Sequence, residues 1–384
     1  MKPKLLLVAA LIIGAVLTRV TPAIAQYPTC LASSADGHQI IGGFYSGAVS
    51  ISTDFGHTWS PYAVPNANWS AVASSADGSV LFAAINGGGI YVSTNSGTTW
   101  NLSDAPTEMW GAMAASEDGI KVIAATTLGG GPIYTSTNAG STWASNSLPS
   151  LTWASVASSA DGLKLVAVAG NGIYTSTNAG ATWATNNSTG SFWMGVASSA
   201  DGTRLVAVDA SYGGGGYDSA DGIWISTNSG ETWTKTDAPI EFWESVASSA
   251  TGTRLAATSL GAIYVSSDAG STWTQIGSGF TGDWHSITSS ADGGVIVAAD
   301  GFSGSTFVKY STPAQHLTVA TANGDLVLSW LVPSINLALE QTTNLLTPNW
   351  TIVPTAPTLT NLQYQTILST TAINTFFRLS PKGP

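Results

Sequence analysis

Cysteine and charge are what this sequence most lacks. Cys30 is the single cysteine among 384 residues, so no disulfide can form within the chain. Charged residues make up 9% of the chain, and 11 Lys and Arg face 22 Asp and Glu. An acidic protein repels nucleic-acid phosphates and anionic lipid headgroups, so we expect neither as a partner. We interpret Cys30 as a small apolar residue of the first strand.

Long apolar runs and clustered histidines are also missing beyond the N-terminus. No later stretch approaches the roughly 20 apolar residues of a membrane span, so the mature chain is not expected to insert into a membrane. The four histidines, His38, His57, His285 and His316, show no metal-ligand spacing. There is no nucleophile elbow and no cysteine–histidine pair. We therefore predict no metal and no cofactor.

The N-terminus has the layout of a secretory signal peptide. Lys2 and Lys4 precede an apolar run at 5–17, and Ala-Ile-Ala ends at Ala25. We predict cleavage after Ala25 and a secreted, monomeric protein in the extracellular or periplasmic space. Retention as a membrane anchor is the alternative, because Arg19 lies late in the segment.

A repeated unit fills the chain from about residue 27 to 313. Its clearest copy, Trp153 to Trp183, places two tight-turn signals between short apolar runs, which predicts four strands of five to seven residues joined by hairpins. The first turn signal is Ser-Ser-Ala-Asp-Gly or a near version. Its Asp position is occupied by Asp36, Asp77, Asp118, Asp161, Asp201, Thr251 and Asp292.

The second turn signal reads Ser-x-Asp/Asn-x-Gly-x-Thr-Trp. It ends at Trp59, Trp100, Trp143, Trp183, Trp233 and Trp273. The polar side chains suit turn capping, Gly suits a left-handed position, and Trp is expected to pack over it. These segments, such as STNAGATW, resemble the Asp-box (BNR) repeat of sialidase-like β-propellers. The pattern also looks like that of photosystem II assembly-factor-like propellers.

The resemblance implies an all-β fold with a seven-bladed β-propeller over residues 26–313, after a signal peptide at 1–25. The last unit has the first turn and three plausible strands but no second turn. Its fourth strand is expected from 316–320, from residues near Gln26, or not at all. Residues 314–384 alternate differently, which predicts six or seven short strands in a small β-sandwich. That segment resembles fibronectin-III-like modules of secreted bacterial proteins; without a core of its own it would cover the propeller's open edge.

Candidate binding residues lie where the units differ. A second tryptophan opens each inner strand, at Trp69, Trp110, Trp153, Trp193, Trp243 and Trp284. These rings are either core between blades or an aromatic platform for a ligand. An insertion at 210–222, with Tyr212, Tyr217 and Asp218, is either a ligand-covering loop or a tolerated surface insertion.

The best polar cluster comes from the sixth and seventh units. Glu244 and His285 follow their inner tryptophans, and Glu241 and Asp283 precede them. Because these units adjoin in a propeller, we expect the four to converge on one rim. They form an active site or ordinary loop decoration.

The residues that sialidases use to bind their substrate have no matching set in this sequence. Sialidases bind a substrate carboxylate with three arginines, but Arg204 and Arg254 share one repeat position on the other face and Arg378 lies outside the propeller. Sialidase activity is therefore not expected. We predict a non-enzymatic binding or scaffolding protein for glycan or protein. The alternative is a polysaccharide-active glycoside hydrolase with two facing carboxyls among Asp209, Asp218, Glu241, Glu244 and Asp283.

Overall fold

The computed structural model describes most of the chain after the first residues. The described ranges are 16–20, 28–62, 64–127, 129–170, 172–186, 192–210, 222–277, 282–301, 306–310, 317–322, 325–332, 337–343, 349–360, 362–369 and 375–381. They contain strands and turns and no helix, in agreement with the expected all-β fold. It follows that none of these residues belongs to a helix that could cross a membrane.

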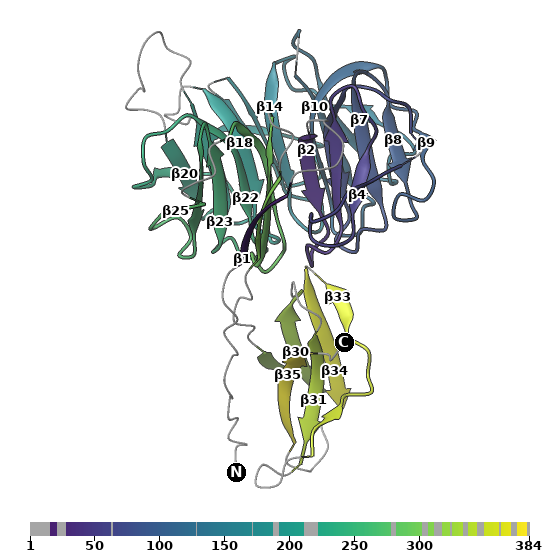
Figure 1. The fold of residues 1–384 in the computed structure, drawn as a ribbon, viewed down its shortest axis with the longest axis vertical. Helices are drawn as coiled ribbons and strands as arrows, with labels where there is room; N and C mark the ends of the chain where they lie inside the picture. Colours follow the sequence, from purple (N-terminus) through teal and green to yellow (C-terminus); the bar gives the residue numbers. More distant parts are fainter. Residues whose placement is uncertain are drawn as a thin grey trace.

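Four-stranded antiparallel meanders repeat along the ring of the molecule (Figure 1). The first three units contain β2 (Pro28–Ser33), β3 (Ile40–Phe44), β4 (Ser50–Ser52), β5 (Ser60–Pro61); β6 (Trp69–Ser74), β7 (Leu81–Gly88), β8 (Ile90–Ser93), β9 (Asn101–Leu102); and β10 (Glu108–Ala115), β11 (Val122–Thr126), β12 (Ile133–Ser136), β13 (Ala144–Ser145). The second and third units are also joined through β7 and β10. The sequence therefore predicted these strands and their order.

The next units follow the same plan. They contain β14 (Trp153–Ser158), β15 (Leu165–Ala169), β16 (Gly172–Ser176), β17 (Ala184–Asn186); β18 (Trp193–Ser198), β19 (Leu205–Asp209), β20 (Gly222–Ser226), β21 (Thr234–Lys235); and β22 (Trp243–Ser248), β23 (Leu255–Ser259), β24 (Ala262–Ser266), β25 (Thr274–Ile276). The last has β26 (Trp284–Ser289), β27 (Val295–Asp300) and β28 (Thr306–Tyr310). The outermost strands have only two or three residues, shorter than the predicted five to seven.

The units are arranged in a closed circle. Each inner strand packs on the inner strand of the next unit, and β26 packs on β2. The peptide groups at the third position of the first turn add a hydrogen-bonded ring, in which each N–H donates to the carbonyl of the next unit at 2.7–2.8 Å. That ring runs through Ala35, Ala76, Glu117, Ala160, Ala200, Ala250 and Ala291 and returns to Ala35. This arrangement is a β-propeller.

The first turn is held by its own polar side chains. In the fifth unit, Asp201 accepts the Ser199 hydroxyl at 2.6 Å and the Thr203 N–H at 2.9 Å. Gly202 has a φ of 66°, which glycine adopts without strain. Thr251 makes longer contacts at the same position in the sixth unit, 3.3 Å to the Ser249 hydroxyl. The turn therefore forms with or without the carboxylate.

The second turn uses its polar residues as predicted. The Ser176 hydroxyl accepts the Gly180 N–H at 3.0 Å, and Asn178 accepts the Thr182 N–H at 2.9 Å. The Trp183 indole donates to the Gly180 carbonyl at 3.0 Å. Two successive residues are left-handed, Ala179 with φ 55° and Gly180 with φ 84°. The sequence predicted this conformation only for the glycine.

The last unit is closed by the N-terminus of the chain. β1 (Val16–Val20) pairs antiparallel with β28 and supplies the fourth strand. This strand lies inside the segment interpreted as a signal peptide, before the expected residues near Gln26. The other expected fourth strand, at 316–320, lies in part outside the described residues. Its described part belongs to the C-terminal strands instead. Both expected positions were therefore wrong.

The C-terminal strands form two sheets with a shared core. One sheet has β29 (Thr318–Ala322), β30 (Asp325–Leu331), β34 (Gln363–Ser369) and β33 (Thr358–Thr360), and the other has β32 (Thr351–Ile352), β31 (Leu337–Thr342) and β35 (Phe376–Pro381). Leu328, Trp330, Leu339 and Val353 are buried between them. A separate core is present, so these strands are not merely a cover for the edge of the ring.

These strands dock on one end of the propeller axis (Figure 1). Buried Val332 packs with Ala35, Ala250 and Ala291 of the ring. The tip of the β33–β34 hairpin reaches the same place, where Leu362 lines an axial cavity of about 140 Å³ together with residues of every unit. The C-terminal strands therefore cover the end of the axis that carries the first turns.

Candidate functional site

The two ends of the propeller axis differ in what they present. The first turns of all units and the second turns of the earlier ones lie at one end, which we call the turn face, and the C-terminal strands dock there. The starts of the inner strands and the ends of the second strands lie at the other end, which we call the free face. Because hairpins alternate between the two ends of a sheet, the connections that vary between units also lie at the free face.

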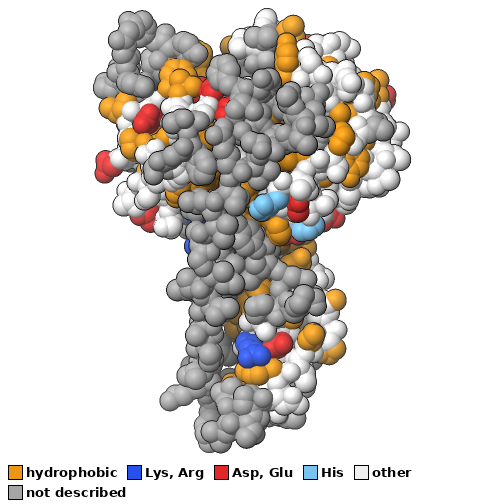
Figure 2. All heavy atoms as spheres, viewed as in Figure 1, with side chains coloured by type: hydrophobic (Ala, Val, Ile, Leu, Met, Phe, Trp, Pro, Cys, Tyr) orange, Lys and Arg blue, Asp and Glu red, His pale blue; other side chains and the backbone are white. Residues whose placement is uncertain are grey.

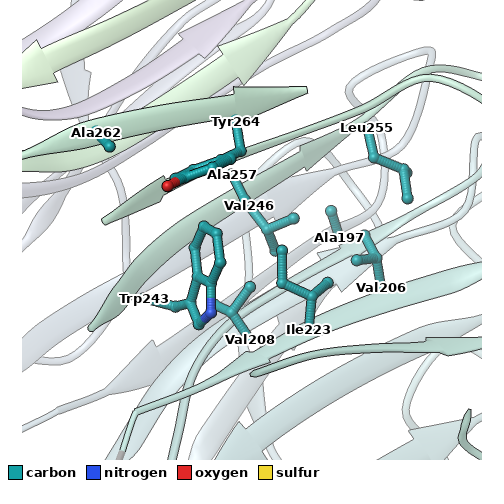
Figure 3. Packing of buried hydrophobic residues seen from close by; sticks show 10 residues of the cluster. All are labelled: Ala197, Val206, Val208, Ile223, Trp243, Val246, Leu255, Ala257, Ala262 and Tyr264. Atoms are coloured by element: carbon teal, nitrogen blue, oxygen red, sulfur yellow. The ribbon is translucent and has the colours of Figure 1, made fainter. Parts of the chain in front are cut away.

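The six inner tryptophans are core residues. Their side chains are 0–1% exposed, so none offers a ring to a ligand. Trp243 lies between two units, against Val208 and Ile223 on one side and Tyr264 on the other (Figure 3). In the earlier units the indole N–H also bonds a glycine carbonyl of the preceding unit, as Trp153 does with Gly131 at 2.9 Å. The rings are buried by packing between units, so they do not support the prediction of an aromatic platform for a ligand.

A polar cluster occupies the free face where the sixth and seventh units meet. His285 Nε2 lies 3.0 Å from Asp283 Oδ2, and its Nδ1 lies 3.7 Å from Glu244 Oε2. Glu244 and His285 are on neighbouring inner strands, β22 and β26, one residue after each buried tryptophan. The expected convergence is present for these three residues. The imidazole ring is 43% exposed, so the cluster is open to solvent.

Asp300 is a buried acidic residue in contact with the cluster. It ends β27, is 2% exposed, and accepts the Asp283 N–H at 3.4 Å. A Cβ on Gly301 would lie 2.6 Å from His285 Nε2, so a glycine is needed for the ring to lie there. Sequence reasoning missed Asp300, although an acid at the end of a buried strand was a usable signal.

The pKa values of His285 and Asp283 are shifted by their surroundings in the cluster. The Glu244 carboxylate raises the pKa of His285, burial opposes this, and the charges of Asp283 and Asp300 add to the rise. Burial raises the pKa of Asp283; the His285 charge opposes that rise, and Glu244 and Asp300 add to it. Both shifts favour the protonated form, for His285 because of the neighbouring carboxylates and for Asp283 chiefly because of burial.

The other predicted acids have different surroundings. Glu241 accepts the Tyr264 hydroxyl at 3.1 Å, away from the cluster, and Glu108 makes the same contact with Tyr134 in the third unit. Repetition of this pair indicates a structural role, so the expectation that Glu241 joins the cluster was wrong. Buried Asp209 accepts the Phe192 N–H at 2.9 Å, at the position that Asp300 occupies in the last unit.

Part of the predicted site lies outside the described residues. This concerns Tyr212, Tyr217 and Asp218 of the insertion. Cys30 is described and packs beside the core between the first two units. Burial raises the pKa of its thiol to about 11, offset only in part by hydrogen bonds from Thr29 and Gly43. A protonated thiol fits the predicted structural role.

Exposed apolar side chains gather at the free face. Of the large hydrophobic residues of the ring that are more than two fifths exposed, Ile120 and Leu163 belong to the turn face. The others lie at or beside the free face: Tyr45, Leu102, Met109, Phe192, Ile240 and Leu260. Leu260 pairs with Asp283 in an isolated bridge, so it borders the polar cluster. Sequence analysis did not identify these residues, because they occupy different offsets in different units.

Basic side chains gather at the opposite end. Lys121, Lys164, Arg204 and Arg254 share one repeat position after the first turn, and each stem packs beside the turn glycine of the next unit. Arg378 instead pairs with Glu340 at 2.8 Å among the C-terminal strands. Figure 2 also shows few Lys or Arg side chains on the face of the molecule that it presents. Arg204, Arg254 and Arg378 therefore cannot form one carboxylate clamp.

Structural comparison places the ring among β-propellers. The structure titled "YCF48 bound to D1 peptide" has a TM-score of 0.59 and 16% identity, over 77% of this chain and 97% of that one. YCF48 from Cyanidioschyzon merolae has a TM-score of 0.59 and 17% identity, over 77% and 98%. The Cps50 (Swd1) β-propeller domain of Myceliophteria thermophila has a TM-score of 0.59 and 12% identity, over 77% and 99%. At these identities the likeness concerns the fold.

Sequence comparison adds no family. No protein-family model matches the chain. No curated protein matches it significantly.

Proposed function

We propose that this chain is an exported, non-enzymatic binding or scaffolding protein that holds a protein partner on its free face. The observation that carries the proposal is the location of the exposed apolar side chains. Six of them lie at the end of the axis that the C-terminal strands leave uncovered, and one of these, Leu260, borders the acidic cluster. Exposed apolar patches with a polar surround are typical of protein interfaces.

The chemistry of the face suggests the kind of partner. Ile240 and Leu260 of the sixth unit are aliphatic, and the inner tryptophan rings are buried. Glu244, Asp283 and Asp300 give the face a negative charge. A segment with apolar side chains flanked by Lys or Arg would complement both features. The peptide-bound YCF48 structure is a precedent for peptide binding on this fold, and a glycan ligand is the second choice.

The proposed architecture has three parts. We propose a leader at 1–25, a seven-bladed Asp-box propeller at 26–313, and a fibronectin-III-like β-sandwich at 314–384. The hydrogen-bonded ring of first turns supports the propeller. The two C-terminal sheets around one core support the β-sandwich. Pairing of β1 with β28 adds a condition, since cleavage after Ala25 would remove that strand.

A polysaccharide-active hydrolase is the alternative. Such an enzyme needs a sugar between two carboxyl groups. His285 lies between Glu244 and Asp283, with one ring nitrogen facing each. The ring fills the space in which a glycosidic bond would lie, so we place binding before catalysis.

The test compares matched exposed residues on the two faces. A photo-crosslinking residue is placed at 240 or 260 on the free face, and at 120 or 163 on the turn face, in the full chain expressed in its own cells. We expect protein adducts from positions 240 and 260 alone. When the crosslinker is at one of these two positions, changing the other to serine should reduce the adducts. Equal adducts from both faces would contradict the proposal. Oligosaccharides released from a polysaccharide panel would favour the hydrolase.

A further inference from the structure

We propose that Glu244, Asp283 and His285 bind a divalent transition-metal ion of the zinc class at the free face. One ligand atom from each of the three lies within 4.8 Å of the others. Zinc bonds of about 2.0–2.2 Å hold neighbouring ligands roughly 3.3–3.6 Å apart in a tetrahedron. Asp283 Oδ2 and His285 Nε2, 3.0 Å apart, are close to that spacing. Glu244 Oε2 lies 3.7 Å from the other ring nitrogen, Nδ1, so its side chain must turn toward Nε2 to complete the ligand set.

Charge at the cluster favours a cation. The charged groups that act on Asp283 among the described residues are His285, Glu244 and Asp300. One imidazole thus faces three carboxyl groups, and no lysine or arginine is among them. Repulsion between carboxylates is relieved by a bound divalent ion as well as by protons.

A buried carboxylate oxygen gives independent support. Asp283 Oδ1 is buried and has no hydrogen-bond partner among the described residues, although its side chain is 11% exposed overall. A buried acceptor without a partner is costly, so such atoms are rare in folded proteins. An ion held at this carboxylate would compensate for the missing partner.

The ligand types select the metal. Calcium takes six to eight oxygen ligands and magnesium retains most of its waters, whereas imidazole with carboxylates suits zinc and its neighbours. His285 comes from the rim of the free face and is 43% exposed, so an ion can enter from solvent. The three protein ligands leave a position for water or for a group of a partner.

Gly301 provides a way to disturb the geometry without removing a ligand. It follows β27, and a Cβ added there would collide with the His285 ring. Its φ is not in the left-handed region, so alanine fits the backbone. Gly301→Ala is therefore expected to move the imidazole away from Asp283 and to weaken metal binding.

The test is calorimetric titration of the chelator-treated full chain with ZnCl₂, then with CaCl₂. We expect one zinc site with a Kd of about 10 μM or tighter, and calcium at least about tenfold weaker. Glu244→Gln, Asp283→Asn, His285→Gln and Gly301→Ala should each weaken zinc at least about tenfold. Glu231→Gln and His57→Gln, exposed at second turns of the turn face, should leave the affinity unchanged. Circular dichroism of every variant checks the fold.

Two results would overturn the proposal. One is zinc binding no tighter than about 1 mM in the parent chain. The other is equal affinity in the parent chain and the folded ligand variants, which would place the ion elsewhere. Zinc alone is titrated, so the result does not depend on the proposed protein partner. Absorption bands of the Co²⁺ form provide a second readout, since tetrahedral and octahedral cobalt differ in intensity.

Discussion

The Leu362 N–H donates to Glu117 Oε2 at 2.9 Å and so ties the C-terminal strands to the propeller. Glu117 is the exception in its repeat position, where the other units have alanine. Leu362 is left-handed, with a φ of 56°, at the tip of the β33–β34 hairpin. The exception in the repeat and the tip of the hairpin therefore meet at the axis.

Glu117→Ala should loosen this docking and leave the ring intact. A hydrogen bond to a charged group contributes about 1.5–3 kcal/mol, less where solvent reaches it. We expect hydrogen exchange in peptides that cover 357–366 to accelerate at least about fivefold, with little change in the ring. Glu231→Gln is the control. Unchanged exchange in that segment would show that Val332 and its apolar neighbours hold the tip alone.

Two buried tryptophans should tolerate phenylalanine differently. Trp153 bonds the Gly131 carbonyl at 2.9 Å, whereas Trp243 Nε1 is buried with no partner among the described residues. Both substitutions lose a similar ring volume, but only Trp153→Phe breaks a hydrogen bond. We expect Trp153→Phe to lower the free energy of unfolding by about 1 kcal/mol more than Trp243→Phe. Urea unfolding measures this, and equal losses would indicate that a water satisfies Trp243.

Acid should weaken the first turns that contain aspartate. Burial tends to raise the pKa of Asp201, but hydrogen bonds from the Ser199 hydroxyl and the Thr203 N–H outweigh it and hold the pKa below the ordinary 3.8. A lowered pKa in the folded state stabilises the fold above the unfolded-state value, and that contribution is lost as pH falls through the folded-state value.

Asp201→Thr copies the natural turn at Thr251 and supplies the matched variant. At about pH 7 the variant should unfold at a lower urea concentration than the parent chain. As the pH falls below 3.8 the two midpoints should approach each other, because the contribution of the aspartate is lost as the pH falls through its folded-state pKa. A difference that stays constant between these pH values would contradict this account.

Removal of residues 1–25 should expose the edge of β28. β1 pairs with β28 over five residues, and the other units obtain their outer strand from their own sequence. We expect the chain that starts at Gln26 to melt at least about 2 °C below one that starts at Ile13 and keeps β1. Differential scanning calorimetry makes the comparison, and sequencing of the N-terminus of the protein isolated from cells shows which form they contain. Equal melting temperatures would show that β28 needs no fourth strand.

The repeat made much of the ring predictable, because its information is local. Asp201 and Gly202 specify one turn, and Trp153 begins the inner strand where the pattern placed it. Closure by β1 was not predictable, since Val16–Val20 and β28 are almost 300 residues apart in the sequence and share no motif. Local signals do not record such long-range pairing.

The candidate site was predicted in part for the same reason. Glu244 and His285 follow equivalent tryptophans, so the repeat placed them side by side. Asp300 reaches the cluster across a strand pair, where it lies opposite Trp284. Glu241 has a residue type that suits the site but contacts Tyr264 of its own unit. Position in the repeat predicts where a backbone lies better than where a long side chain turns.

The hydrogen-bonded cycle of first turns has a consequence for how such a chain can change in length. Each N–H points to the next unit in the same sense around the axis, and Ala291 returns to Ala35. An open solenoid gains or loses a repeat at its ends without disturbing the others. Here there is no end at which to add one, and an extra copy would have to widen every junction at once. A change in the number of units therefore requires an adjustment at the junctions around the whole ring.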